Sequence, residues 1–198
     1  FASEPEVERR HPEMVDERRV VRPRAERAHP QIRPLARLLP LWRTLSARAT
    51  PVGAGPWSWL DITAGIPVIL PGTVEEFVPQ MANLDLVGGV SFTKGCYPGQ
   101  EIVARMHYLG RLKQRMFRAH VEDTRPPQPG TAVFAPDLPD QSTGTVVDAQ
   151  SSPEGGYDLL AVVHLSSKQA GELHLANSDG PRLTLKDMPY SMEPAADA

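Results

Sequence analysis

The sequence predicts a mainly β protein with some α-helix, whose C-terminal part forms an antiparallel β-barrel. Apolar Phe117, Ala119 and Val121 alternate with Arg118 and His120, which is the pattern of a strand with one buried face. After residue 130, glycines recur at intervals of about 8 to 16 residues, a spacing typical of sandwiches and small barrels. A Gly- and Pro-containing loop before residue 100 leads into a helical pattern, which supplies the α component.

Composition excludes several classes of protein. The chain has 198 residues, of which 40% are hydrophobic, and a net charge of -3, as expected for a soluble protein of one or two domains. Its apolar runs fall far short of the roughly 20 residues that span a bilayer, so no membrane partner is expected. The sequence pI of about 6.1 gives no reason to expect direct nucleic-acid binding. A single cysteine excludes disulfides within the chain and favours a cytoplasmic location.

Residues 1–50 differ from the rest of the chain. They hold 11 arginines, 7 acidic residues and no lysine or glycine, giving a net charge of +4, whereas the remaining residues carry -7. Several prolines, of which Pro40 is the last, interrupt any helical pattern. Two interpretations remain open. The segment is a disordered or partly helical arm, or its amino-acid sequence is the translation of a shifted reading frame of GC-rich DNA at the start of a truncated chain.

Residues 51–110 predict a short α+β region. Residues 57–62 are expected to form a strand, followed by a turn at Gly65 and an extended segment. Thr73, with Glu76 three residues later, predicts a capping box and a short helix that ends before Pro79. A helix is expected to begin near Pro98 and to run through His107, with its buried side formed by Ile102, Val103 and Met106.

The octet at residues 94–101, Lys-Gly-Cys-Tyr-Pro-Gly-Gln-Glu, is the chemically richest part of the sequence. Cys96 is placed just before a helix N-terminus and two residues from Lys94, an environment that favours the nucleophilic, metal-binding thiolate. The alternative is that Cys96 is a small buried apolar residue. Tyr97, Gln100 and Glu101 complete the motif, and the last two could hold a water or a one-carbon group, or simply orient the loop.

Residues 111–194 are expected to form the barrel. Residues 157–165 are apolar on both faces, as in a central strand, and Leu183 and Leu185 supply a last short strand. His120, His164 and His174 lack metal-ligand spacing, so we expect structural histidines and no metal site.

The octet resembles the signature of the YgfZ family, and the sequence around it also resembles sequences of that family. The supporting runs are Trp57…Asp61-Ile62…Ala64-Gly65-Ile66-Pro67, Phe77-Val-Pro-Gln80, Asn83-Leu-Asp85 and the C-terminal Met188-Pro189-Tyr190-Ser191. The resemblance covers roughly residues 57 to 194. It implies a C-terminal remnant of a folate-binding, aminomethyltransferase-like body (51–110), followed by the barrel (111–194). It also implies a function: folate-dependent synthesis or repair of iron–sulfur clusters, which supports tRNA modification.

The resemblance assigns roles to individual residues. Cys96 matches the signature cysteine, with Lys94, Tyr97, Gln100 and Glu101 as its functional setting. Trp57 matches a tryptophan associated with tetrahydrofolate or another reduced folate, and its indole could stack on a flat ring. Arg105 could pair with the glutamate tail of folate. Alternatively, Trp57 is buried at a domain boundary, and Arg105 lies on a solvated helix face. The implied partners are folate and iron–sulfur assembly or client proteins.

The sequence also departs from the family pattern. A YgfZ protein carries a long α+β body before the position of Trp57. The sequence that precedes Trp57 in this chain does not resemble such a body. Two other functions therefore stay open. One is aminomethyl transfer to tetrahydrofolate, and the other is a non-catalytic barrel module that has lost its folate site.

Overall fold

The computed structural model describes residues 35–92, 94–108, 110, 112–138 and 141–192. Most of the predicted irregular segment (1–50) thus lies outside the described residues. Its described part includes helix α1 (Leu35–Ser46), which continues through Pro40 although we expected prolines to interrupt helical structure. Proline removes one helical hydrogen bond, and on this exposed helix the carbonyl that loses its partner can be hydrated. The Thr44 Oγ1 donates to the Pro40 carbonyl over 3.0 Å in the following turn.

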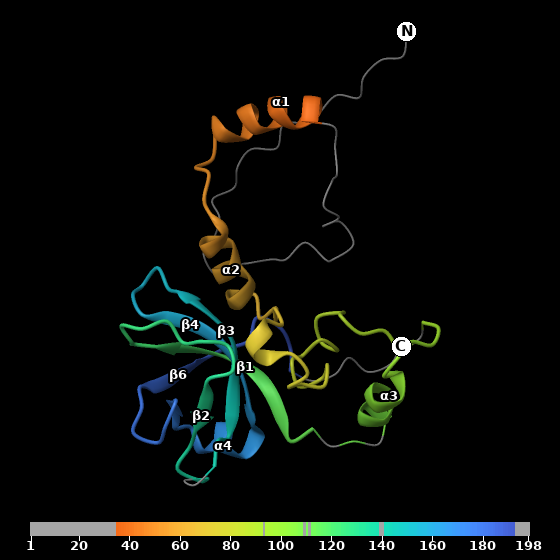
Figure 1. Cartoon of the computed structure of the whole chain (residues 1–198), viewed down its shortest axis with the longest axis vertical. Coiled ribbons are helices and arrows are strands. Elements are labelled where there is room, and N and C mark those ends of the chain that lie inside the picture. Colours follow the sequence, from red (N-terminus) through yellow and green to blue (C-terminus); the bar gives the residue numbers. More distant parts are fainter. Residues whose placement is uncertain (1–34, 93, 109, 111, 139–140, 193–198) are drawn as a thin grey trace.

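A closed antiparallel barrel forms the C-terminal part, which confirms the predicted fold class. Its strands are β1 (Gln114–Val121), β2 (Ala132–Phe134), β3 (Gly144–Ser151), β4 (Tyr157–His164), β5 (Leu173–Leu175) and β6 (Arg182–Lys186). Their order around the barrel is β1-β4-β3-β2-β5-β6, and β6 pairs with β1 to close it. In Figure 1 the barrel lies below α2 and away from α1.

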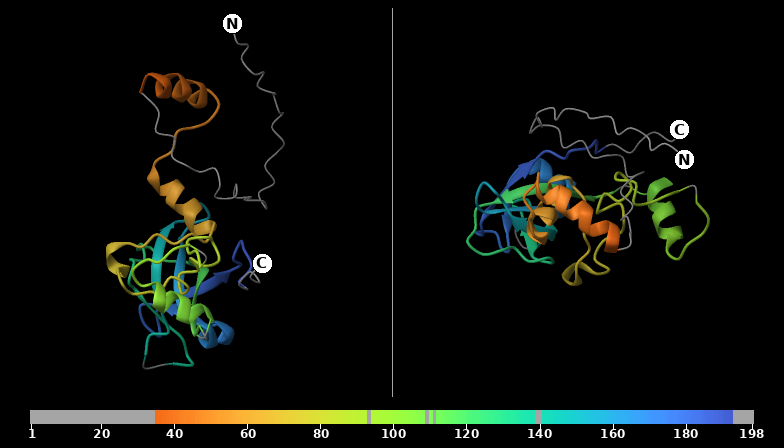
Figure 2. Two further views of the ribbon diagram at one scale, coloured as in Figure 1. Left: turned by 90° about the vertical axis from the view of Figure 1, so that its right-hand side faces the viewer. Right: turned by 90° about the horizontal axis from the view of Figure 1, so that it is seen from above.

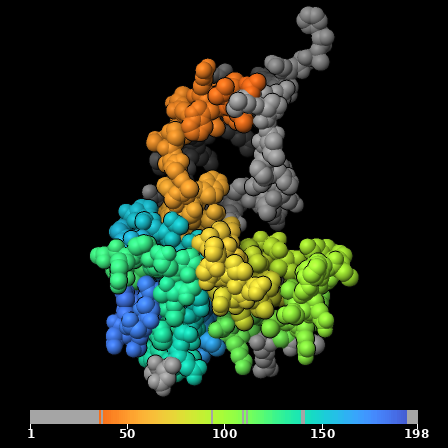
Figure 3. Space-filling model, viewed as in Figure 1, coloured from red at the N-terminus to blue at the C-terminus, as the bar shows by residue number. Residues whose placement is uncertain are grey.

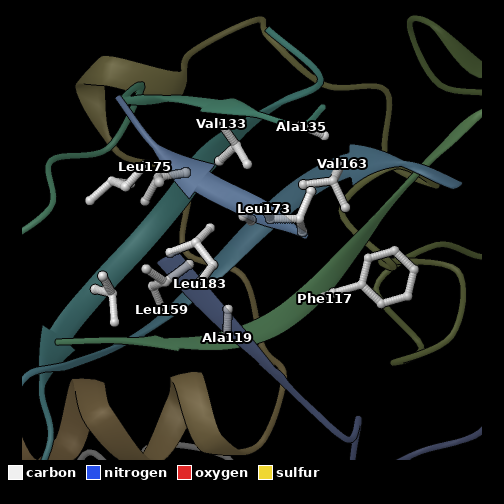
Figure 4. Close-up of a cluster of buried hydrophobic side chains, with 12 residues drawn as sticks. Phe117, Ala119, Val133, Ala135, Leu159, Val163, Leu173, Leu175 and Leu183 are labelled. Carbon is white, nitrogen blue, oxygen red and sulfur yellow. The ribbon is translucent and has the colours of Figure 1, made fainter. Parts of the chain in front are cut away.

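The barrel interior is apolar. Alternate residues of β1, namely Phe117, Ala119 and Val121, point inward as the sequence pattern predicted, and they meet Leu159 of β4 and Leu183 of β6. Figure 4 shows Ala119, Leu159 and Leu183 grouped between the strands, with Phe117 to their right. Leu159 and Val121 are fully buried, so this cluster is the main source of hydrophobic stabilisation.

The predicted strand at residues 57–62 is wrong, because these residues belong to helix α2 (Ala54–Thr63). The helix packs on the outer face of the barrel, where Ile62 joins a second apolar cluster with Met116 and Leu160. Tertiary packing of one helical face has overridden a local sequence of strand-forming residues. The predicted turn at Gly65 is confirmed. Its φ is +66°, and an added Cβ would lie 2.7 Å from the Tyr190 ring.

The predicted capping-box helix is also wrong. Thr73 Oγ1 instead accepts from the backbone N–H of Leu70 at 3.3 Å and closes the 3₁₀ turn η2 (Pro71–Thr73). Glu75 has a φ of +64°, which a right-handed helix does not allow. Residues 74–92 and 94–99 form turns and irregular chain up to α3.

The predicted helix after the octet is present as α3 (Gln100–Tyr108). Val103 is buried as expected, but the assignment of Ile102 to the buried side is wrong, since 62% of Ile102 is exposed. In Figure 1 and in the right view of Figure 2, α3 lies beside the barrel, away from α2. The space-filling view shows the yellow segment near residue 75 between the barrel and the green segment that contains α3 (Figure 3).

Two short strands and a helix were not anticipated from the sequence. The strands are β2 and β5, and helix α4 (Leu165–Ala170) follows β4. Among the described helices, none has both the length and the apolar character needed to cross a bilayer.

Candidate functional site

The octet forms an exposed loop that leads into α3. Gly99 has a φ of +83°, a left-handed conformation that glycine adopts readily. The Gln100 backbone N–H donates to the Tyr97 carbonyl at 3.2 Å, and the Tyr97 N–H donates to Gln100 Oε1 at 3.3 Å. This reciprocal pair works as a cap at the start of α3. The Gln100 side chain therefore orients the loop in this structure.

Lys94 and Tyr97 are brought together within the loop. The Lys94 ammonium lies 4.7 Å from the centroid of the Tyr97 ring, a cation–π contact. The backbone N–H of Lys94 donates to Ser91 Oγ at 3.3 Å. These contacts hold a positive charge within two residues of Cys96.

Cys96 is a free and exposed cysteine. The alternative interpretation, a small buried apolar residue, is therefore wrong. The thiol lies four residues before the first residue of α3, and Glu101 is exposed in the first turn of that helix. An accessible sulfur in this position is available to react or to bind a metal or cluster supplied by another molecule.

Gln80, a residue that the sequence did not single out, anchors α3. Its Nε2 donates to the Val103 carbonyl at 2.7 Å, and the side chain is buried. Its Oε1 has no hydrogen-bond partner among the described residues. Phe92 and His107 add a stacked contact with 3.8 Å between ring centroids. The helix is thus held mainly through polar and aromatic contacts.

A buried ion pair connects the segment before the loop to the barrel. Arg115 of β1 binds Asp85 through both terminal nitrogens, at 2.8 and 3.0 Å, and each side chain is only 7% exposed. Arg115 Nη1 also donates to the Gln80 carbonyl at 3.1 Å. Asn83 Nδ2 donates to the Met116 carbonyl at 2.8 Å. Gln80, Asn83 and Asp85 lie in the runs that carry the family resemblance, which is the signal that could have marked them as a group.

A hollow of about 300 Å³ lies at this junction, and Gln80 contributes to its wall. The other lining residues are Asp85, Met106, His107, Gly110, Leu112, Arg115 and Met192. Cys96 is not among them, so this hollow and the exposed thiol are separate features.

The two residues expected to bind folate are not brought together. Trp57 is 68% exposed on α2, so the interpretation as a buried boundary tryptophan is wrong, and Arg105 is exposed on α3. The two helices lie apart in Figures 1 and 2. Neither residue lines the hollow at Gln80.

Trp59, two residues after Trp57, belongs to a polar network on the barrel surface. Its indole Nε1 donates to Asp158 Oδ2 at 2.7 Å, while Asp158 Oδ1 lies 2.8 Å from His120 Nδ1. The other ring nitrogen of His120 lies 3.1 Å from Glu122 Oε1. Burial by itself would lower the pKa of His120, but the hydrogen bonds to Asp158 and Glu122 outweigh it and raise the pKa above its usual value.

The carboxyl group of Asp158 responds in the opposite direction. Burial would raise its pKa, but hydrogen bonds from Trp59, His120 and Ser152 leave it below the usual value. Below the raised pKa of His120 the network is an imidazolium between two carboxylates, and it ties α2 to the barrel. Within the described ranges, no group of three or more His, Cys, Asp or Glu side chains could hold a metal ion.

Comparison with known proteins finds relatives that share one name. The chain is 37% identical over 155 residues to the tRNA-modifying protein YgfZ of Edwardsiella ictaluri, covering 77% of this chain and 46% of that protein. It is 37% identical over 142 residues to the protein of the same name from Cronobacter sakazakii, covering 70% and 43%. A 61-residue stretch is 54% identical to the Colwellia psychrerythraea protein, covering 31% and 19%.

These matches limit what can be transferred. The chain spans less than half the length of these curated relatives. No family model matches the sequence. The repeated agreement over about 70% of the chain, together with the octet and the closed barrel, leads to one conclusion: this chain belongs to the YgfZ family.

Proposed function

We propose that this chain supports the synthesis or repair of iron–sulfur clusters in a folate-linked process and thereby contributes to tRNA modification. The relatives carry the name tRNA-modifying protein, and the family resemblance links such proteins to iron–sulfur enzymes. The observation that carries the proposal is the exposed thiol of Cys96 in a loop capped at the start of α3. The partners are then iron–sulfur assembly factors or client iron–sulfur proteins of the cytoplasm.

Cys96 is the proposed reactive centre, and the neighbouring residues have separate tasks. As a thiolate, its sulfur is a nucleophile and a ligand for iron. Lys94 supplies positive charge nearby, and Tyr97 holds the Lys94 ammonium in place. Gln100 fixes the loop through the cap, which leaves Glu101 as the exposed acid–base group of the motif.

The described residues do not fit a whole folate molecule by themselves. Trp57 offers a flat exposed ring and Arg105 an exposed guanidinium, which suit a pterin ring and a glutamate tail respectively. They lie on helices that stand apart in Figures 1 and 2, and neither lines the hollow at Gln80. The chain matches less than half of its relatives, and we propose that folate binding depends on protein corresponding to the rest of them.

Complementation tests the proposal directly. The full chain is expressed in a bacterium that lacks its own YgfZ-type protein, together with the part of a YgfZ relative that the chain does not match. Methylthiolated tRNA nucleosides are quantified by mass spectrometry. We expect the modification to rise with the wild-type chain and to stay at the background level with Cys96→Ser. The matched control is Ser178→Ala, an exposed hydroxyl substitution between β5 and β6, which should restore the modification as well as the wild type does.

The second arm of the experiment uses Trp57→Phe, in which Cys96 is intact. It separates the dependence of tRNA modification on folate from its dependence on the thiol. Restoration by Cys96→Ser at the wild-type level would remove Cys96 as the reactive centre. If the folded wild-type chain and both variants fail equally, the non-catalytic barrel module is the better description.

A further inference from the structure

Two cations lie opposite each other on the outer face of the barrel. Arg118 of β1 is in register with Lys186 of β6, while the flanking pairs Ala119–Leu185 and Val121–Leu183 contribute to the core. Side chains directly opposite each other on one sheet face are close neighbours, and like charges in such a pair destabilise the sheet. An anion bound between them would remove this repulsion.

In the part of the chain that the structure describes, neither cation forms a direct ion pair with a carboxylate. The ion pairs found there involve Arg115, His120 and His174, not Arg118 or Lys186. Arg118 Nη1 donates to the backbone carbonyl of Asp187 at 3.1 Å, which leaves further N–H groups on the same guanidinium. Burial lowers the pKa of Arg118, although the charges of Asp158 and Asp187 act in the opposite direction.

The two cations border a hollow of about 440 Å³. It is also lined by Trp59, Thr63, Ser152, Pro153, Glu154 and Asp158. Both carboxylate oxygens of Asp158 are hydrogen-bonded, one to Trp59 and the other to His120, within the network described above. Glu154 is exposed on the β3–β4 turn and is the remaining acidic group of the lining.

A second hollow, of about 430 Å³, adjoins the first. It is lined mainly by apolar atoms from Gly55, Pro56, Trp59, Leu60, Gln150, Ser151, Ser152 and Pro153. Trp59, Ser152 and Pro153 line both hollows, so the two adjoin between α2 and the β3–β4 turn, and together they are called the groove. The bond from Trp59 to Asp158 fixes the orientation of the indole in this groove.

We propose that this groove binds a small molecule in which a flat apolar group carries a phosphate or carboxylate. The flat group lies in the apolar hollow against Trp59, and the anionic group lies between Arg118 and Lys186. Neither Cys96 nor Trp57 lines the groove, so the site is separate from the one in the proposed function and does not depend on it.

The test follows the indole N–H signals of the full chain by NMR during titration with phenyl phosphate. Trp59→Phe assigns the Trp59 signal among the three tryptophans of the chain. We expect a saturable shift of that signal, and binding about tenfold weaker with inorganic phosphate, which lacks the ring, or with benzyl alcohol, which lacks the charge. Benzoate, tested in parallel, distinguishes a carboxylate ligand from a phosphate ligand.

Charge variants locate the anion. Lys186→Gln, at an exposed position, should weaken phenyl phosphate binding about tenfold, and Arg118→Gln at least as much, while Glu154→Gln should tighten it about two- to threefold. An unchanged backbone spectrum shows that each variant is folded. The proposal is overturned if phenyl phosphate and benzoate leave the Trp59 signal unmoved up to about 10 mM. Equal binding of inorganic phosphate, or unaltered binding by folded Lys186→Gln, would overturn it as well.

Discussion

The barrel and the octet with its helix are stabilised in different ways. Inside the barrel, residues such as Leu159 and Val133 are completely buried and pack against one another without polar groups. In α3 only Val103 is buried, and the helix is held by the Gln80 bond and the Phe92–His107 stack. The barrel therefore provides the stability, and the octet can expose a reactive thiol because little of the fold depends on it.

The largest effect is expected where the two regions are tied together, at Asp85. Asp85→Asn leaves the charge of Arg115 buried without its partner, so the free energy of unfolding should fall by about 3 to 5 kcal/mol in urea denaturation. Asp85→Leu combined with Arg115→Met removes both charges and should recover most of the loss. A single variant within about 1 kcal/mol of wild type would show that the pair does not connect the two regions energetically.

Truncating one aliphatic side chain in each region sharpens the comparison. Leu159→Ala creates a cavity in the barrel core and should cost about 3 kcal/mol, whereas Ile102→Ala, on the exposed face of α3, should cost less than about 0.5 kcal/mol. Urea denaturation followed by circular dichroism measures both. Equal losses would mean that Ile102 is buried in solution and that α3 packs more closely than described.

A smaller, pH-dependent effect is expected at the network that ties α2 to the barrel. Because folding raises the pKa of His120, its contribution is fully present below the ordinary value of 6.5 and is lost as pH rises through the raised value. Because folding lowers the pKa of Asp158, its contribution is present above 3.8 and is lost as pH falls. The stabilisation should therefore be largest between these two pH values.

His120→Gln measures that dependence. The loss of unfolding free energy should be about 1 kcal/mol near pH 5.5 and should shrink steadily toward pH 9. A difference that grows with pH would contradict an imidazolium between Asp158 and Glu122. Glu122→Gln is the matched control and should reduce the same dependence, because Glu122 contacts the second ring nitrogen.

The smallest stability effect is expected at Cys96. Cys96→Ser should change the free energy of unfolding by less than about 0.5 kcal/mol, because the side chain is exposed. It should also abolish alkylation of the chain, since Cys96 is its single cysteine. An activated thiolate predicts that wild-type alkylation at pH 7 is faster than for a cysteine in an unfolded peptide.

Local patterns predicted those parts of the fold that have a clear period. Strand β1 has alternating apolar residues and β4 is apolar on both faces, so both were expected. Strands β2 and β5 span three residues each, too few to show a period. Helix α2 was missed because its stability comes from packing Ile62 against the barrel, a contact that the local sequence does not contain.

The candidate site was predictable only in part, for a related reason. The octet is contiguous, so Cys96 and its neighbours could be picked out from the sequence. The residues that position the octet, Gln80 and Asp85, act through Val103 and Arg115, which are distant in sequence. Such polar pairs are defined by the folded structure, and nothing in the spacing of single residues reveals them.

Closure of the barrel has a consequence for the rate of folding. Strand β1 pairs with both β4 and β6. Ala119 and Leu185, which are paired in the closed barrel, lie near opposite ends of the barrel sequence. Contacts of such large sequence separation must overcome loop-closure entropy before they contribute stability, and they slow folding. Until β6 arrives, one edge of β1 is an unpaired strand that can join a neighbouring chain. Aggregation during refolding should therefore decrease when the protein is diluted.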